Sequence, residues 1–279
     1  GNNTQGQLGL GHNKCQKIPI ELFLCATIKS VSCGGYHTVA LTVIPNKIYV
    51  WGSNESGQLG LGNVNDKNLS HELILHKPII SISCGGFHTV ALTGSEYLNK
   101  IYVWGCNHIG ELGLGDFNDR NIPCELNLQK NVIAISCGED CTIALTDQND
   151  IYMWGRHLGY KKGINLPKKL IIGDSIVSIC CGNYFAIALT KSKNYYSWGC
   201  LGCPRVPKKP TYDKANFISS EPKYFIHADP IISVSCGGDH IIAVSISDKI
   251  YVWGHNGCDQ LGLGDNIDQK SPKVLEFKF

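Results

Sequence analysis

Histidine and cysteine, which serve as bases, nucleophiles and zinc ligands in many proteins, recur in one motif of this 279-residue chain. The motif reads SCGGYHTVAL at 32–41, SCGGFHTVAL at 83–92, SCGEDCTIAL at 136–145, CCGNYFAIAL at 180–189 and SCGGDHIIAV at 235–244. One position holds His37, His88 and His240, but Cys141 and Phe185 in the other two copies. A catalytic base would not be replaced by phenylalanine, so we predict structural hydrogen bonds for these histidines.

The cysteines of the same motif recur in every copy, so we predict that they are small buried hydrophobic residues. They are Cys33, Cys84, Cys137, Cys181 and Cys236. A second arrangement, Cys200-x-x-Cys203, has zinc or redox spacing, but no second Cys-x-x-Cys accompanies it. We expect free thiols there and leave open whether the pair binds a metal. We predict no metal site.

The sequence has no phosphate-binding P-loop, no G-x-S-x-G elbow and no H-E-x-x-H metalloprotease motif. We therefore predict a protein that is not an enzyme and needs no cofactor or small-molecule substrate. No apolar run approaches the roughly 20 residues that a membrane helix needs, so no membrane partner is expected. The 14 cysteines lie in a chain large enough to have a core, which favours a reducing compartment, nuclear or cytoplasmic.

A third group of residues is basic. The whole chain has a net charge of +2, but residues 156–223 hold 12 Lys and Arg against 3 Asp and Glu. The residues that we expect to bind a partner are Arg156, Lys161, Lys162, Lys168, Lys169, Arg205, Lys208, Lys209 and Lys214, with Tyr212 and Phe217 as apolar anchors. They follow Trp154 and Trp198, which are equivalent positions of adjacent repeats, so they should share one rim. Such a rim would attract an acidic protein or a phosphate backbone; a solvated lysine-rich loop is the equal alternative.

The element that must position these residues is a repeat of about 50 residues. Every Trp is followed by Gly, and a turn such as GSNESGQLGLGN at 52–63 comes after it, except in the two basic units. Alternating segments such as 79–84, 88–93 and 100–105 predict three strands per unit, and 123–126 predicts an outer fourth. Four short strands per unit indicate an all-β propeller. The structural positions of the repeat are Trp51, Trp104, Trp154, Trp198, Trp253, Gly34, Gly85, Gly138, Gly182, Gly237, His37, His88 and His240.

These motifs resemble the regulator of chromosome condensation (RCC1-type) repeat, with its CGxxHT-A-L stretch, its V-WG strand end and its N-x-x-GQLGLG turn. The resemblance covers essentially the whole chain, and implies one propeller domain over 1–279. The family usually has seven blades, whereas this chain has five and a half repeats. We therefore expect a fragment of a longer protein with an open or truncated ring, and a smaller closed ring as the second choice. Residues 155–224 would form the irregular basic blades.

The resemblance also implies a protein-interaction domain. The family's best-known member docks on nucleosomes and is an exchange factor for the Ran GTPase, so a Ran-like GTPase, histones or DNA are the implied partners. Two other functions remain open: a scaffold associated with ubiquitin ligases or trafficking, and a secreted enzyme-inhibitor propeller. Residues 94–99 and 211–224 are the protrusions in which an exchange-active loop would be sought.

Overall fold

The computed structural model describes residues 1–94, 99–156, 163–201 and 217–276, with side chains of the last range described from residue 221. The described residues form twenty β-strands in five four-stranded antiparallel sheets. The all-β prediction is thus confirmed. In the described ranges, no helix is long and apolar enough to cross a membrane.

Each sheet is one blade, and its strands follow one another in chain order. Blade 1 consists of β1 (Ile28–Cys33), β2 (His37–Thr42), β3 (Lys47–Gly52) and β4 (Lys67–Ile74). Blade 2 consists of β5 (Ile79–Cys84), β6 (His88–Thr93), β7 (Ile101–Gly105) and β8 (Arg120–Leu126). Blade 3 consists of β9 (Val132–Cys137), β10 (Cys141–Thr146), β11 (Ile151–Gly155) and β12 (Ile164–Leu170).

The last two blades have the same order. Blade 4 consists of β13 (Ile176–Cys181), β14 (Phe185–Thr190), β15 (Tyr195–Cys200) and β16 (Phe217–Phe225). Blade 5 consists of β17 (Ile231–Cys236), β18 (His240–Ser245), β19 (Ile250–Gly254) and β20 (Gln269–Val274). The predicted outer strand at 123–126 lies within β8, with Pro123 on the edge strand as expected.

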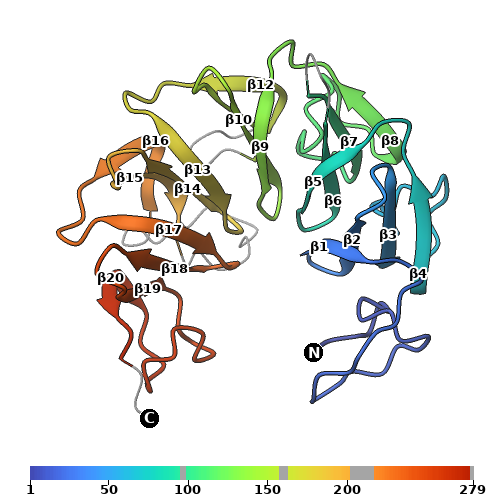
Figure 1. The fold of residues 1–279 in the computed structure, drawn as a ribbon, viewed down its shortest axis with the longest axis horizontal. Helices are drawn as coiled ribbons and strands as arrows, with labels where there is room; N and C mark the ends of the chain where they lie inside the picture. The colour runs from blue at the N-terminus through green and yellow to red at the C-terminus, as the bar shows by residue number, and fades with distance from the viewer. Residues whose placement is uncertain (95–98, 157–162, 202–216, 277–279) are drawn as a thin grey trace.

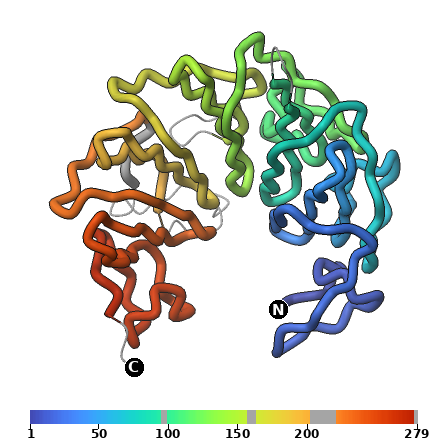
Figure 2. The backbone as a smooth tube through the Cα atoms, viewed as in Figure 1, coloured from blue at the N-terminus to red at the C-terminus, as the bar shows by residue number. Residues whose placement is uncertain are grey.

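The blades are arranged around a centre as an open ring (Figure 1). The first strand of each blade is innermost, and β1 contacts β5, β5 contacts β9, β9 contacts β13, and β13 contacts β17. The tube view shows the N-terminal segment and blade 5 on opposite sides of the opening (Figure 2). The open ring agrees with our first expectation.

The second strand of each blade forms most of the core. In β2, β6, β10 and β14 every residue is buried. The last three strands lie between two neighbouring blades, whereas β2 lies between blade 2 and the N-terminal turn, whose Gln7 backbone oxygen accepts from Thr38 Oγ1 and Trp51 Nε1. The corresponding strand of blade 5, β18, is buried only at alternate positions, and Ile242 is exposed. Blade 5 lies at the end of the open ring, where no further blade covers its outer face.

The prediction for the motif cysteines is wrong at two positions. Cys33 is exposed, because β1 begins the ring and no earlier blade packs on it. Cys236 is not a free thiol but forms a disulfide with Cys180 of the preceding blade. Cys84, Cys137 and Cys181 are buried and free, as predicted.

The disulfide follows from the repeat. Cys84 donates its backbone N–H to the Ser32 hydroxyl of the preceding blade at 2.9 Å, and Cys137 does the same to Ser83. Blade 4 has Cys180 at that serine position, which places its sulfur beside the cysteine of blade 5. A single change from serine to cysteine in the repeat therefore converts a hydrogen bond between blades into a covalent bond.

Candidate functional site

One end of the ring carries most of the irregular sequence, and we call it the turn face. Strands alternate in direction within a blade, so the loop between the first and second strands emerges at the same end as the connection between the third and fourth. The basic connections from β11 to β12 and from β15 to β16 therefore begin and end on the turn face. Nearer the centre are the five short loops that follow the motif cysteines.

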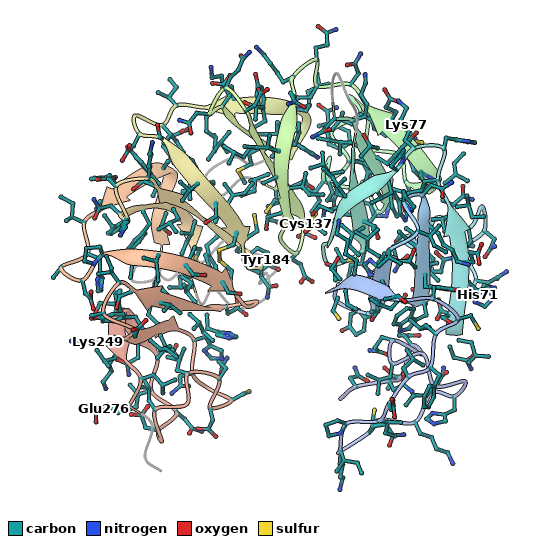
Figure 3. The ribbon with its side chains drawn as sticks, viewed as in Figure 1. His71, Lys77, Cys137, Tyr184, Lys249 and Glu276 are labelled. Atoms are coloured by element: carbon teal, nitrogen blue, oxygen red, sulfur yellow. A yellow bond between two sulfur atoms is a disulfide. The ribbon has the colours of Figure 1, made fainter. Side chains whose placement is uncertain are left out.

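The central loops carry aromatic and acidic side chains, of which Tyr184 is buried. The residue before the motif histidine position is Tyr36, Phe87, Asp140, Tyr184 and Asp239 in the five blades. Tyr36 and Phe87 stack with their ring centroids 5.6 Å apart. Figure 3 shows Tyr184 and Cys137 near the centre of the ring. Aromatic rings beside carboxylates are suited to contacts with a protein partner.

Of the predicted partner-binding residues, the structure describes the side chains of three. Arg156 lies on the turn face and donates from Nε to Asp140 Oδ2 at 2.8 Å. Lys168 and Lys169 lie in β12 opposite Met153 and Tyr152, away from the strand end at which Arg156 lies. Lys169 pairs with Asp150 at 2.7 Å, and this contact raises the pKa of its ammonium group. The structure therefore separates these two lysines from Arg156.

The other predicted residues lie outside the described part, and their role stays a prediction. They are Lys161, Lys162, Arg205, Lys208, Lys209, Tyr212 and Lys214. Phe217 begins β16 opposite Cys200, and its side chain is not described. Of the predicted protrusions, residues 95–98 and 211–216 also lie outside the described part, whereas residues 217–224 belong to the outer strand β16 and do not form a protruding loop.

The turn after the third strand of blade 1 connects this blade to blade 2 through hydrogen bonds. The backbone oxygen of Gln58 accepts from Trp104 Nε1 at 2.9 Å and from Thr89 Oγ1 at 2.8 Å, both in blade 2. Gly60 has a φ of 72°, and a Cβ there would lie 2.9 Å from Trp104 Nε1. The QLGLG turn is therefore a contact surface for the next tryptophan.

A second hydrogen bond connects the histidine of blades 1 and 2 to a threonine of the next blade. His37 Nε2 lies 2.9 Å from Thr89 Oγ1, and His88 Nε2 lies 3.0 Å from Thr142 Oγ1. Because Thr89 donates its hydroxyl hydrogen to Gln58, the histidine must be the donor, which fixes its tautomer. Burial lowers the pKa of His37 to about 4 and that of His88 to about 3, so both are neutral at neutral pH.

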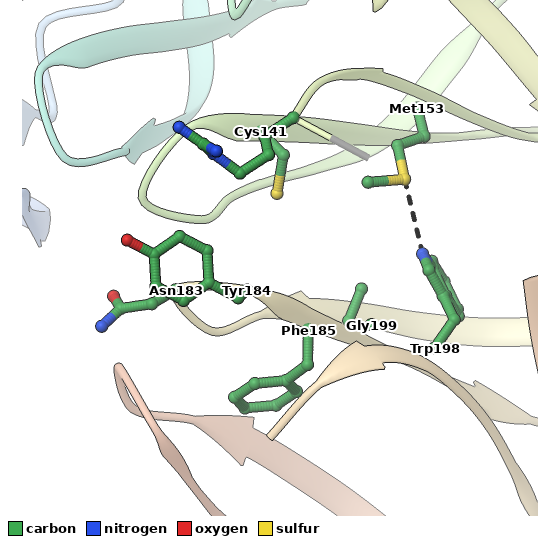
Figure 4. A pocket seen from close by; sticks show the side chains of 9 residues that line it. Cys141, Met153, Asn183, Tyr184, Phe185, Trp198 and Gly199 are labelled. Atoms are coloured by element: carbon green, nitrogen blue, oxygen red, sulfur yellow. Dashed lines mark hydrogen bonds between the residues drawn. The ribbon is translucent and has the colours of Figure 1, made fainter. Parts of the chain in front are cut away.

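The interface between blades 3 and 4 lacks both kinds of hydrogen bond. Cys141 and Ala186 replace the histidine and the threonine, and no QLGLG turn precedes Trp198, whose Nε1 instead lies 3.4 Å from Met153 Sδ. Since cysteine and alanine are smaller than the residues they replace, a small cavity of about 10 Å³ remains, lined by Cys141, Ala186 and Trp198 (Figure 4). The space is near that of one water molecule.

Potential metal ligands are the cysteine pair at 200 and 203 and, among the described residues, one group in blade 2. The expectation of free thiols is wrong at Cys200, which is buried and disulfide-bonded and so offers no free thiolate; Cys203 lies outside the described residues. In the turn after β7, the ligand atoms of Cys106, His108 and Asp119 lie within 4.8 Å of one another. Our sequence reasoning missed this turn, although Cys106 and His108 stand where the turn of blade 1 has Ser53 and Glu55.

Sequence comparisons identify the repeat. Residues 47–279 match the model of the RCC1-like domain, and residues 1–41 and 28–58 match models of the regulator of chromosome condensation (RCC1) repeat. The chain is 28% identical to the ultraviolet-B receptor UVR8 of Arabidopsis thaliana over 99% of its length and 52% of the relative. It is 30% identical to the probable E3 ubiquitin-protein ligase HERC4 of Homo sapiens over 96% of its length and 21% of the relative.

Solved structures have the same fold. Human WBSCR16 superposes with a TM-score of 0.83 at 22% identity, covering 99% of this chain and 75% of that one. Saccharomyces cerevisiae Prp20p, whose structure was described with its binding to Gsp1p and histones, superposes with a TM-score of 0.59 at 20% identity. The superposition covers 99% of this chain and 85% of Prp20p. The chain thus spans about half of UVR8 and a fifth of HERC4.

Proposed function

The chain belongs to the RCC1 family of repeat propellers, and from that premise we propose that its turn face binds a Ran-like small GTPase and promotes release of the bound nucleotide. Exchange of this kind requires no bond chemistry in the propeller. It requires only that the turn face bind the nucleotide-free GTPase more tightly than the nucleotide-bound form.

One observation carries this proposal. The two departures from the regular repeat, in blades 3 and 4, both replace a compact QLGLG turn by a connection that begins and ends on the turn face. In regular blades the turn is occupied by packing on the next tryptophan, as Gln58 and Gly60 show. Blades 3 and 4 lack the QLGLG residues that have this packing role in blade 1.

The likeness to Prp20p supports the choice of partner, because that protein was studied for binding to Gsp1p and histones. We propose histone or DNA contact as an accompanying activity of the basic connections, and a nuclear or cytoplasmic location. The test is binding to mononucleosomes over a salt series. Affinity should fall steeply with salt, and the slope should decrease in a variant with Lys161, Lys162, Lys208 and Lys209 changed to alanine. A slope unchanged by these substitutions would contradict the contact.

A scaffold in a ubiquitin-ligase assembly is the second proposal, favoured by the 30% identity to HERC4 over nearly the whole chain. Pull-down with a Ran-like GTPase in its nucleotide-free and GDP-bound forms separates the two functions. An exchange factor retains the nucleotide-free form preferentially. A scaffold of other partners retains neither form, or both equally.

A further inference from the structure

The turn between β7 and β8 carries a group of side chains that the proposed function does not use. Cys106, His108, Glu111 and Asp119 all belong to this turn, which packs on blade 3 through the Glu111 backbone oxygen. His108 Nδ1 lies 3.7 Å from Asp119 Oδ1, and Cys106 Sγ lies 3.8 Å from Glu111 Oε1. These are a thiol, an imidazole and two carboxylates, the side chains that hold zinc in proteins.

The spacing is close to that of a zinc site. With Zn–S near 2.3 Å and Zn–N and Zn–O near 2.0 Å, tetrahedral ligand atoms lie about 3.3 to 3.5 Å apart. The ligand atoms of Cys106, His108 and Asp119 already lie within 4.8 Å of one another. His108 is 73% exposed, so its ring is free to rotate toward the other ligands. Only small side-chain movements are needed to bring the ligand atoms to bonding distance.

An independent observation is the buried carboxylate of Glu111. This residue is only 2% exposed, and among the described residues no Lys or Arg lies within ion-pair distance of it. Its Oε2 accepts from the Ile109 backbone N–H at 2.8 Å, while Oε1 points at the Cys106 sulfur. A buried carboxylate is costly without a positive charge, and a bound cation would supply one.

The equivalent turn of blade 1 has an aspartate, Asp66, in the place of Asp119, but it shows that the fold does not require the cysteine and the glutamate. There Ser53 and Gln58 occupy the positions of Cys106 and Glu111, and they form a neutral hydrogen bond of 3.2 Å. In blade 2 both members of this buried neutral pair are replaced by metal-ligating residues, and a histidine is added two positions after the cysteine. Asp119 is held in place because its Oδ1 also accepts from the Asn107 backbone N–H at 2.8 Å.

We infer that this turn is a binding site for a zinc-class divalent ion, with Cys106, His108 and Asp119 as ligands and Glu111 completing the coordination. Thiolate and imidazole ligands select zinc or cobalt over magnesium and calcium. Binding requires the thiolate, so one proton leaves Cys106 for each ion bound. The site would brace the contact between blades 2 and 3.

Cobalt is the direct probe, because thiolate coordination produces a sulfur-to-cobalt charge-transfer absorption. Titration of the untagged protein with Co²⁺ should give this band at one ion per chain, and Zn²⁺ should remove it by displacement. The double variant Cys106→Ser, Glu111→Gln recreates the Ser53 and Gln58 pair of blade 1, so it should fold and should lose the band. His108→Ala should bind Co²⁺ at least about tenfold more weakly.

Cys258→Ser is the matched control, because Cys258 is an exposed free thiol in the equivalent turn of blade 5. It should keep the full band. Circular dichroism verifies that each variant is folded. The site would be ruled out by a wild-type protein without the band, or by a folded Cys106→Ser, Glu111→Gln variant that keeps it. An affinity unchanged in His108→Ala would remove the imidazole from the ligand set and overturn the site as inferred.

Discussion

His37 in blade 1 donates a hydrogen bond of 2.9 Å to Thr89 in blade 2, and the two residues are replaced together elsewhere in the ring. His88 and Thr142 repeat the pair at the next interface. Blades 3 and 4 meet through Cys141 and Ala186, and blades 4 and 5 through Phe185 and Ile241, all buried. Each interface thus has either two polar partners or two apolar ones, which is what the cost of an unpaired buried polar group requires.

The first prediction concerns this coupling. Thr89→Ile should lower the free energy of unfolding by about 1 to 3 kcal/mol, because it leaves the buried His37 donor without an acceptor. His37→Phe should cost less, since Thr89 keeps its bond to Gln58. The double variant reproduces the Phe185 and Ile241 pair. Its loss in the free energy of unfolding should be smaller than the sum of the two single losses by at least about 0.5 kcal/mol. Urea denaturation of the four proteins measures the coupling, and strict additivity would show that the pair does not act as a unit.

The second prediction is a pH dependence. His37 and His88 have pKa values of about 4 and about 3 when folded, both depressed by burial from the ordinary value of 6.5. Unfolding therefore takes up protons below about pH 6.5. As the pH is lowered, the free energy of unfolding should decrease by up to about 1.4 kcal/mol per pH unit for each histidine. The loss should run from about pH 6.5 toward pH 4.

Denaturation at pH 7.0, 6.0 and 5.0 checks this dependence. His37→Phe, Thr89→Ile provides the control, because it removes the contribution of His37 and keeps those of His88 and His240, whose pKa values burial also lowers, so it should show a smaller slope. The same slope in both proteins would mean that His37 is not the titrating group.

Much of the fold could be predicted from the sequence because of the repeat. Strands such as His88–Thr93 and the tryptophan spacing predicted the four-stranded blades because their periodicity and their positions are local properties of the chain. The hydrogen bond between His37 and Thr89 could not be predicted from the sequence, because 52 residues separate them and the packing of one blade on the next determines the contact. Aligning the motif copies would have shown the joint replacements at 141 and 186.

The cysteines illustrate a different limit. All five copies of the motif look alike at the cysteine, yet Cys33 is exposed and Cys236 is disulfide-bonded. The first difference depends on the position of β1 at the opening of the ring, and the second on one serine that is a cysteine in blade 4. Neighbouring blades, rather than the motif itself, determine the state of each thiol.

The third prediction tests the turn-to-tryptophan contact. Gly60→Ala should destabilise the protein more than Gly262→Ala, although both glycines have positive φ values, 72° and 65°. A Cβ at Gly60 would lie 2.9 Å from Trp104 Nε1, whereas at Gly262 the nearest atom is 3.6 Å away. The backbone penalty of about 1 to 2 kcal/mol is common to both variants, so the excess in Gly60→Ala measures the packing clash. Equal melting temperatures for the two variants would argue against the contact.

The fourth prediction concerns the Cys180–Cys236 disulfide. Cys180→Ala should lower the free energy of unfolding by about 2 to 4 kcal/mol through loss of the crosslink. Cys180→Ser should recover about 1 kcal/mol of that loss, because serine at this position accepts the next blade's N–H in the other interfaces, as Ser32 does from Cys84. Thermal denaturation with and without reductant measures both effects.

Cys25→Ser, at an exposed free thiol, is the control and should behave as the unsubstituted protein does. If reductant lowers the melting temperature of Cys180→Ser as much as that of the unsubstituted protein, the Cys180–Cys236 bond does not brace blades 4 and 5.

The most direct measurement of the proposed function is the release of fluorescent GDP from a Ran-like GTPase, with and without a stoichiometric excess of this protein. A propeller that binds the nucleotide-free state preferentially should accelerate release many-fold. Replacing the connection between β15 and β16 by a QLGLG-type turn should abolish the acceleration while the ring stays folded. Release at the background rate in the presence of the folded protein would contradict nucleotide exchange and favour a scaffold whose partners are other proteins.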